Sequence, residues 1–239
     1  MAPARRLRRV ILYAAAAIVC ASAAHPGPPG YAPERAAMVK DLRSRGIEGE
    51  RVLAAMGKVP RHTFVSQEHS ARAYENAELP AGGGQPLVSP YLAARTIEYL
   101  DLEPDSKVLQ VGAGCGYRTV LLCELAGNVW VADHRKEVVG AAQGRVREMG
   151  YSRVTFRNAK ACRGWREHAP YDAILVTCAF DQVPGELFAE LRDGGRMVVP
   201  LGLGPVQTWN GVRNVDGRTR SEKLLTLRAD PAVCSARRP

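Results

Sequence analysis

From residue 107 onward, short apolar runs alternate with segments in which apolar residues recur every three or four positions. Short apolar runs are typical of buried strands, and the wider spacing is typical of amphipathic helices. The predicted strands are residues 107–111, 129–133, 154–157, 173–178 and 196–200. The predicted helices between them are residues 117–126, 137–149 and 184–191. Regular alternation of this kind predicts an α/β fold with a doubly wound, mostly parallel sheet, Rossmann-like in layout and covered by helices on both faces.

The rest of the chain follows different patterns. Helical spacing of apolar residues predicts three N-terminal helices, at residues 34–45, 50–56 and 91–100. Between residues 63 and 90 no periodicity holds, and a loop of this length inside a compact domain usually carries function or is disordered. Near the C-terminus, a hairpin is expected around Asp216-Gly217.

The first 24 residues have the parts of a secretory signal peptide. A basic segment precedes an apolar run at residues 10–19, and the small-residue sequence Ala21-Ser22-Ala23 follows. The basic residues are Arg5, Arg6, Arg8 and Arg9. Because the apolar run is shorter than the roughly 20 residues that a transmembrane helix needs, we expect export to the periplasm or the exterior and no stable membrane insertion after processing. The alternative is an Ala-rich and Arg-rich extension of a cytoplasmic protein.

Composition excludes several classes of protein. The chain has 239 residues, of which 46% are hydrophobic and 24% charged, which excludes a mainly disordered chain and a polytopic membrane protein. The length suits one substantial α/β domain or two small ones. The formal net charge is +9, and the four N-terminal arginines supply part of it. The other basic residues are scattered without an aromatic stripe, so no nucleic-acid partner is expected.

The six cysteines form no CxxC pair and no zinc-type spacing with histidine, so no metal site is predicted. The count does not resemble a disulfide scaffold. Loss of Cys20 with the signal peptide would leave five cysteines, so at least one thiol would stay unpaired in the monomer that we expect. Cys123 and Cys178 lie in apolar runs and are expected to be small buried residues.

A glycine-rich turn follows the first strand of the predicted sheet. That strand is joined to a helix by Val111-Gly112-Ala113-Gly114-Cys115-Gly116, and glycines there let the backbone approach a ligand at the helix N-terminus. Asp133 ends the next strand, where a carboxylate can accept hydrogen bonds from ribose hydroxyls. The dinucleotide fingerprint would require glycine where Tyr117 stands, and no Lys-Ser/Thr pair of a phosphate loop follows. The pattern is typical of S-adenosylmethionine binding, with a glycine-rich turn of an unrelated α/β protein as the alternative.

Further motifs are spread along the chain. Those in the N-terminal half are Val52-Leu53-Ala54-Ala55-Met56, Val59-Pro60-Arg61-His62, Phe64-Val65, Ala73-Tyr74, Leu79-Pro80, Gly84-Gln85 and Pro90-Tyr91. Those in the C-terminal half are Asp133-His134, Lys136-Glu137, Gly164-Trp165, Ala169-Pro170-Tyr171-Asp172-Ala173-Ile174, Val183-Pro184, Gly194-Gly195-Arg196 and Pro200-Leu201-Gly202. With these motifs, residues 38–207 resemble the protein L-isoaspartyl O-methyltransferase family. The resemblance implies a class I methyltransferase fold and methyl transfer from S-adenosylmethionine to the free α-carboxylate of an L-isoaspartyl residue in a damaged protein or peptide.

The resemblance also implies the site. Cofactor-binding residues are expected at Val111, Gly112, Ala113, Gly114, Gly116, Asp133, His134 and Lys160. Substrate-binding residues are expected at Leu79, Pro80, Gln85, Val88 and Ser89. The family's active-site serine falls on Val88, which has no hydroxyl, so the adjacent Ser89 is the candidate catalytic residue. Lys160 takes the place of an aspartate that contacts the adenine, and Gln110 takes the place of an acidic residue at the end of the first strand.

These observations divide the chain into a signal peptide (1–24), a Pro/Gly linker (25–33), N-terminal helices with a substrate loop (34–100), an S-adenosylmethionine-binding α/β core (101–228) and a polar tail (229–239). The first hypothesis is an isoaspartyl methyltransferase that acts in protein repair. The alternatives are a catalytically impaired pseudoenzyme or isoaspartyl-binding protein of the same fold, and a methyltransferase for another acceptor.

Overall fold

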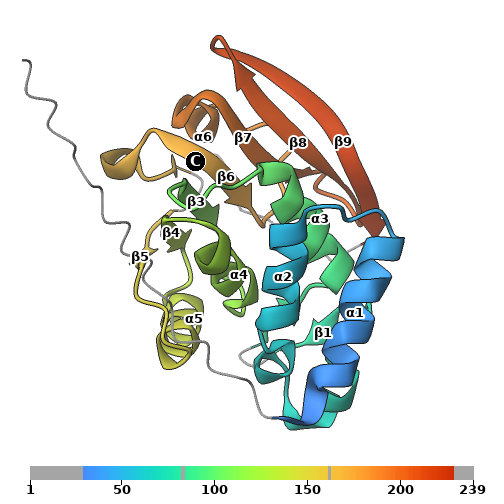
Figure 1. Ribbon diagram of the computed structural model, residues 1–239. Coiled ribbons are helices and arrows are strands. Elements are labelled where there is room, and N and C mark those ends of the chain that lie inside the picture. The colour runs from blue at the N-terminus through green and yellow to red at the C-terminus, as the bar shows by residue number, and fades with distance from the viewer. Residues whose placement is uncertain (1–28, 82–83, 161–162, 229–239) are drawn as a thin grey trace, which may run out of the picture.

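A central β-sheet forms the body of the molecule in the computed structural model, which describes residues 29–81, 84–160 and 163–228. Its seven strands lie in the order β5-β4-β3-β6-β7-β8-β9 (Figure 1). Their bounds are β3 (Lys107–Val111), β4 (Asn128–Asp133), β5 (Val154–Asn158), β6 (Tyr171–Val176), β7 (Leu191–Leu201), β8 (Val206–Val215) and β9 (Arg218–Arg228). Strands β3 to β7 are parallel to one another, whereas β8 and β9 are antiparallel to their neighbours. The expected doubly wound, mostly parallel sheet is confirmed.

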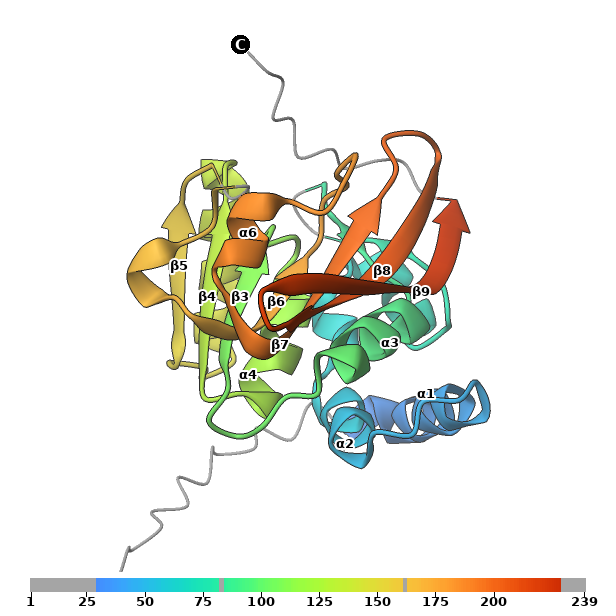
Figure 2. The same ribbon diagram turned by 90° about the horizontal axis from the view of Figure 1, so that it is seen from above.

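Helices accompany the sheet on both faces. Their bounds are α1 (Ala32–Ser44), α2 (Glu50–Lys58), α3 (Pro90–Leu100), α4 (Tyr117–Leu125), α5 (Lys136–Glu148) and α6 (Gly185–Ala189). Short 3-10 helices span Pro29–Tyr31, Arg61–Phe64, Gln67–Arg72 and Arg166–His168. The three predicted N-terminal helices are confirmed as α1, α2 and α3. They pack on one another, and α3 also packs against β6 and β7 (Figure 2).

The strands divide the hydrophobic core into two layers, because successive side chains of a strand point to opposite faces of the sheet. Val108 and Val131 pack with residues of α1 to α5. Leu109 and Ala132 pack on the other face with Leu187 of α6. The central strands β3 and β6 are therefore buried on both faces, which explains why they are mostly apolar in the sequence.

The last strands are longer than the sequence pattern predicts. β7 begins at Leu191 instead of residue 196, and its pairing with β6 shifts register between Tyr171 and Ala173, as at a β-bulge. The expected hairpin is confirmed, since Asp216 and Gly217 join β8 to β9 with φ values of 52° and 74°. Positive φ at both central residues is what a two-residue turn between twisted strands requires.

The segment between α2 and α3 is largely irregular, as expected, and ends in a small hairpin. β1 (Leu79–Pro80) pairs antiparallel with β2 (Pro86–Leu87). Ser89 then caps α3, because its Oγ accepts a hydrogen bond from the Leu92 backbone N–H at 3.3 Å, and Pro90 takes the first helical position. In the described part of the chain, no helix combines the length and the hydropathy needed to cross a bilayer.

Candidate active site

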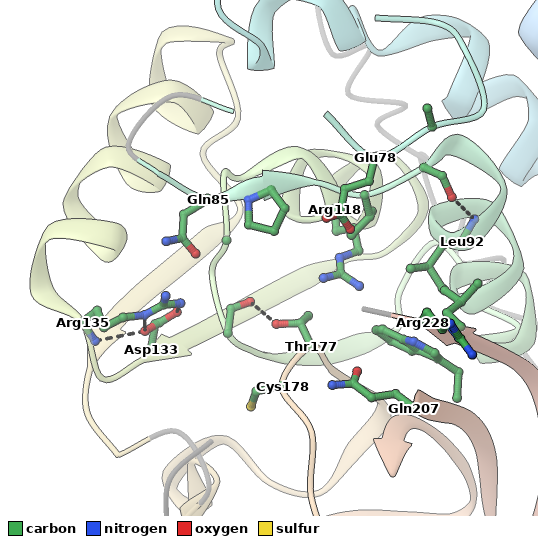
Figure 3. A pocket seen from close by; sticks show the side chains of 18 of the residues that line it. Glu78, Gln85, Leu92, Arg118, Asp133, Arg135, Thr177, Cys178, Gln207 and Arg228 are labelled. Atoms are coloured by element: carbon green, nitrogen blue, oxygen red, sulfur yellow. Dashed lines mark hydrogen bonds and ion pairs between the residues drawn. The ribbon is translucent and has the colours of Figure 1, made fainter. Parts of the chain in front are cut away.

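A cavity of about 450 Å³ lies at the carboxyl ends of β3, β4 and β6 (Figure 3). β3 has β4 on one side and β6 on the other, so the strand order reverses there. Ligands of open α/β sheets bind at such switch points, and the volume lies within the range of small-molecule sites. The lining residues are Asn76, Ala77, Glu78, Gln85, Pro86, Val88, Ser89, Leu92, Gly112, Gly114, Arg118, Asp133, His134, Arg135, Thr177, Cys178, Gln207, Trp209, Leu227 and Arg228.

The loop after β3 requires glycine at its first position. Gly112 has a φ of 92°, and a Cβ built on it would lie 2.1 Å from Thr177 Oγ1. That hydroxyl donates a hydrogen bond to the Val111 carbonyl at 3.0 Å. The loop therefore lies directly against the end of β6, and it faces the cavity at Gly112 and Gly114. Only glycine permits so close an approach in this backbone conformation.

The other predicted loop residues support these two positions. Val111 is fully buried in β3, and Ala113 is buried as well. Gly116 has a φ of 92° and immediately precedes α4. Of the predicted loop residues, Gly112 and Gly114 therefore face the cavity, while Val111, Ala113 and Gly116 hold the backbone in place.

Gln110 stabilises the glycine loop from inside the fold. Its Nε2 donates a hydrogen bond to the Gly112 carbonyl at 2.8 Å, and its Oε1 accepts one from Thr119 Oγ1 at 2.8 Å. The side chain is almost fully buried, so both polar ends need these partners. A carboxylate at this position could not donate to the Gly112 carbonyl. Gln110 therefore has a structural role that suits an amide and not an acid.

Asp133 provides a buried carboxylate at the end of β4. Its Oδ1 accepts hydrogen bonds from the backbone N–H and the Nε of Arg135, at 3.0 and 3.1 Å. Its Oδ2 accepts from the Ala113 N–H and from Arg135 Nη2, both at 3.0 Å. Burial opposes ionisation, but these hydrogen bonds outweigh it and hold the pKa of the Asp133 carboxyl below its ordinary value. The charged carboxylate is thus present, and the Arg135 guanidinium lies against it (Figure 3).

His134 and Lys160 have different surroundings. His134 is half-exposed and lines the cavity, with Nδ1 3.6 Å from Asp133 Oδ1. Lys160 is exposed and is not part of the cavity lining. Its neighbour Ala159 donates its backbone N–H to the Asp133 carbonyl at 3.1 Å, which ties the chain after β5 to the end of β4.

The predicted substrate residues divide into two groups. Gln85, Val88 and Ser89 line the cavity, and Val88 also adjoins the glycine loop in a narrow cleft beside it. Leu79 is buried and Pro80 is exposed, and neither lines the cavity. The Ser89 Oγ accepts the hydrogen bond that caps α3. Its O–H group can still donate a hydrogen bond to a ligand in the cavity.

Several lining residues escaped the sequence analysis. They are Arg118, Arg135, Thr177, Gln207, Trp209 and Arg228. Arg118 is the second residue of the helix after the glycine loop, and Arg135 stands two positions after Asp133, so their places beside known motifs could have indicated them. The others come from the end of β6 and from β8 and β9, which no local pattern connects with the glycine loop (Figure 3).

The cysteines near the cavity differ in state. Cys178 is buried, as expected, but it also lines the cavity and is disulfide-bonded, whereas Cys123 is only half-buried. A buried thiol and a disulfide cysteine in an apolar run look alike in sequence, because the bond depends on spatial geometry that a local pattern does not contain. Cys115 is a buried free thiol, and burial raises its pKa. Within the described residues, no cluster of His, Cys, Asp and Glu is placed to hold a metal ion.

These residues fit S-adenosylmethionine. The backbone of Gly112 and Gly114 is open to the cavity, and Asp133 lies one strand away, where a ribose would find a carboxylate. In this arrangement the ribose hydroxyls would compete with Arg135 for the Asp133 oxygens.

Comparisons with known proteins agree with this geometry. The model of the Protein-L-isoaspartate(D-aspartate) O-methyltransferase family matches residues 33–232. A protein-L-isoaspartate O-methyltransferase of Synechococcus sp. (strain JA-2-3B'a(2-13)) is 44% identical over 207 residues, which cover 84% of this chain and 82% of the relative. One of Dictyoglomus thermophilum is 42% identical over 174 residues, which cover 73% of this chain and 79% of the relative.

Solved structures show the same fold. A protein-L-isoaspartate O-methyltransferase superposes with a TM-score of 0.75 at 25% identity, covering 83% of this chain, and the chain spans 65% of that structure's length. A Plasmodium falciparum structure, named as a β-aspartate methyltransferase in complex with S-adenosyl-L-homocysteine, gives a TM-score of 0.69 at 18% identity and covers 81% of this chain and 95% of its own. The chain therefore belongs to the protein-L-isoaspartate(D-aspartate) O-methyltransferase family.

Proposed function

We propose that the protein transfers a methyl group from S-adenosylmethionine to the free α-carboxylate of L-isoaspartyl residues in damaged proteins, as a repair enzyme. One observation carries the proposal. A single cavity joins the glycine loop and Asp133, which fit the cofactor, to Gln85, Val88 and Ser89 of the predicted substrate segment. Membership of the family supports the same reaction.

The reaction asks little of the side chains. When bound, S-adenosylmethionine supplies a methyl group that is already activated by its attachment to a sulfonium. The acceptor carboxylate is an anion at neutral pH, so its oxygen forms the new bond to carbon without a general base. The electron pair of the broken carbon–sulfur bond stays on sulfur, and no proton moves. The contribution of the protein is therefore to position the reactants and to exclude water.

Particular residues are suited to these tasks. Gly112 and Gly114 leave room for the cofactor beside the backbone, and Asp133 is the acceptor for its ribose hydroxyls. Val88 covers part of the cavity with an apolar surface, which helps to exclude water. Ser89 offers its O–H to the acceptor carboxylate while its lone pair caps α3. In this proposal Ser89 orients the acceptor and neither takes nor gives up a proton.

The test has two steps with the full chain. Calorimetry with S-adenosyl-L-homocysteine measures the cofactor site, and release of methanol from base-labile methyl esters then measures transfer to an isoaspartyl peptide. We expect binding, and methanol release from the isoaspartyl peptide but not from the matched aspartyl peptide. No measurable binding at millimolar ligand would overturn the enzyme assignment. Binding with equal transfer to both peptides, or to neither, would argue for another acceptor.

A second candidate is a protein that binds isoaspartyl segments without turnover. Two observations favour it. Val88 stands where the family resemblance places a serine, and the Asp133 oxygens already hold Arg135. This candidate predicts that an isoaspartyl peptide binds with no methanol release, so the same pair of measurements separates it from the enzyme.

We also propose that the chain is exported and loses its N-terminal segment. The basic residues, apolar run and small-residue end of residues 1–24 support export, and so does the disulfide of Cys178, because disulfides persist in oxidising compartments. Mass spectrometry of the N-terminus of the protein from its native source tests the proposal. We expect a start near residue 24, and an intact start at Met1 or Ala2 would contradict export.

A further inference from the structure

Arg118 presents a partly buried cation to the cavity, with no ion-pair partner in the described part of the chain. It lines the cavity and also the adjoining cleft, where Gly114 and Val88 are its neighbours. Its Nη1 is buried and has no hydrogen-bond partner. Burial lowers the pKa of the guanidinium to about 10, so the group stays charged at neutral pH. A buried charge without a partner is costly, and buried charges are therefore usually paired.

The neighbours of Arg118 hold its guanidinium in place without neutralising it. Its Cζ lies 5.6 Å from the centre of the Trp209 ring, and that ring is itself buried. Glu78 acts to raise its pKa, but it is exposed, and no residue in the described ranges forms an ion pair with Arg118. Figure 3 shows the guanidinium pointing into the cavity between Glu78 and Thr177. The guanidinium thus faces the space that a ligand would occupy.

The surroundings of the guanidinium favour an anionic acceptor. The side chain of Val88, across the narrow cleft, offers no hydrogen-bond donor, and the hydroxyl of Ser89 is partly used in capping α3. Two carboxylates would enter this site, that of the acceptor and that of the amino-acid end of the cofactor. Because Arg118 adjoins Val88 and Glu78 of the predicted substrate segment, it lies on the acceptor side.

We propose that Arg118 binds the α-carboxylate of the isoaspartyl acceptor, an inference that rests on the proposed function. The guanidinium donates to one carboxylate oxygen and leaves the other oxygen to form the new bond to the methyl carbon. The carbon–sulfur bond breaks with its electron pair on sulfur, and Arg118 keeps its proton throughout. The ester product is neutral, so it no longer pairs with the guanidinium, and its release is favoured.

The test uses the full chain with saturating S-adenosyl-L-homocysteine, which forms a complex that cannot react. Calorimetry compares an isoaspartyl peptide with a matched peptide whose α-carboxylate is an amide. We expect the wild-type protein to prefer the carboxylate by about 10- to 100-fold, as a charge-assisted hydrogen bond provides, and Arg118→Gln to lose this preference. Arg147→Gln removes the same charge from the exposed side of α5, outside the cavity, and is expected to keep it.

A purely structural role predicts other results. Since Arg118 Nη1 is buried without a hydrogen-bond partner, we expect Arg118→Gln to keep or raise Tm while losing the preference. An unchanged preference in Arg118→Gln would overturn the inference. A fall in the affinity for S-adenosyl-L-homocysteine alone would also overturn it, because the guanidinium would then belong to the cofactor's carboxylate. If the wild-type protein methylates the peptide and the variant keeps its preference, only the inference fails. If the wild-type protein neither binds nor methylates the peptide, the proposed function fails and the inference with it.

Discussion

Arg135 and the cofactor compete for one carboxylate in this structure. The Arg135 guanidinium donates to both oxygens of Asp133, the group proposed to accept hydrogen bonds from the ribose. Arg135→Leu removes these two side-chain donors. The backbone N–H groups of Arg135 and Ala113 still donate to the carboxylate, so Asp133 stays charged and in place. We therefore expect the substitution to tighten cofactor binding.

The size of the effect follows from the exposure of the pair. The Arg135 side chain is 33% exposed, so its attraction to Asp133 is screened by solvent, although its two hydrogen bonds at 3.0 and 3.1 Å are well formed. A partly exposed pair of this kind is worth about 1 kcal/mol. Release of that competition corresponds to roughly a fivefold lower Kd for the cofactor.

Calorimetry with S-adenosyl-L-homocysteine is the appropriate assay. S-adenosylmethionine carries a positive sulfonium, which an arginine in the site would repel. S-adenosyl-L-homocysteine has no such charge, so removing Arg135 cannot strengthen its binding by relieving that repulsion. Arg147→Leu, at an exposed position of α5, controls for the change in net charge. Weaker binding by Arg135→Leu would refute the reasoning and place Arg135 among the groups that hold the cofactor. Unchanged binding would refute the competition itself.

Three further predictions concern the cofactor side of the cavity. Gln110→Glu places a carboxylate oxygen against the Gly112 carbonyl. We expect the free energy of unfolding, measured with urea, to fall by about 1–3 kcal/mol. No change in this free energy would contradict the assigned hydrogen bond. Gly112→Ala sets a Cβ 2.1 Å from Thr177 Oγ1, whereas a Cβ on Gly114 meets nothing within 4 Å. We therefore expect Gly112→Ala to weaken S-adenosyl-L-homocysteine binding and to lower Tm more than Gly114→Ala does. Equal effects of the two substitutions would argue against the close approach. The folded pKa of Asp133 lies below its unfolded value of about 3.9, so its contribution to stability is complete above that pH and is lost as the pH falls through the folded pKa. Urea unfolding at a series of pH values is therefore expected to show a smaller acid loss of stability in Asp133→Asn, and identical acid limbs would contradict this role.

The sequence predicted the centre of the sheet well because the strands there are buried on both faces. Residues 173–176 are continuously apolar, and three of the five residues at 107–111 are apolar. Both strands lie in the middle of the sheet. The start of β7 was missed, because Gly194 and Gly195 resemble a turn in sequence while the register shift beside Ala173 lets the strand continue through them. That shift depends on the neighbouring strand, and a local pattern contains no information about it.

The candidate site was predicted where it depends on local backbone geometry. Gly112 and Asp133 follow their strands directly, so the motif and its partner could be read from one short segment. The charged groups around them were not predicted. Arg118 and Trp209 meet only because β8 folds back beside β7, and Arg135 turns toward Asp133 through side-chain contacts that sequence spacing does not fix.

The central claim is that this cavity brings a methyl donor to the α-carboxylate of an isoaspartyl residue. Tandem mass spectrometry of paired isoaspartyl and aspartyl peptides, incubated with the protein and S-adenosylmethionine, tests it most directly. We predict one methyl ester, located on the α-carboxylate of the isoaspartyl residue, and none on the aspartyl peptide. Two unmodified peptides, or a methyl group at any other position, would contradict the account.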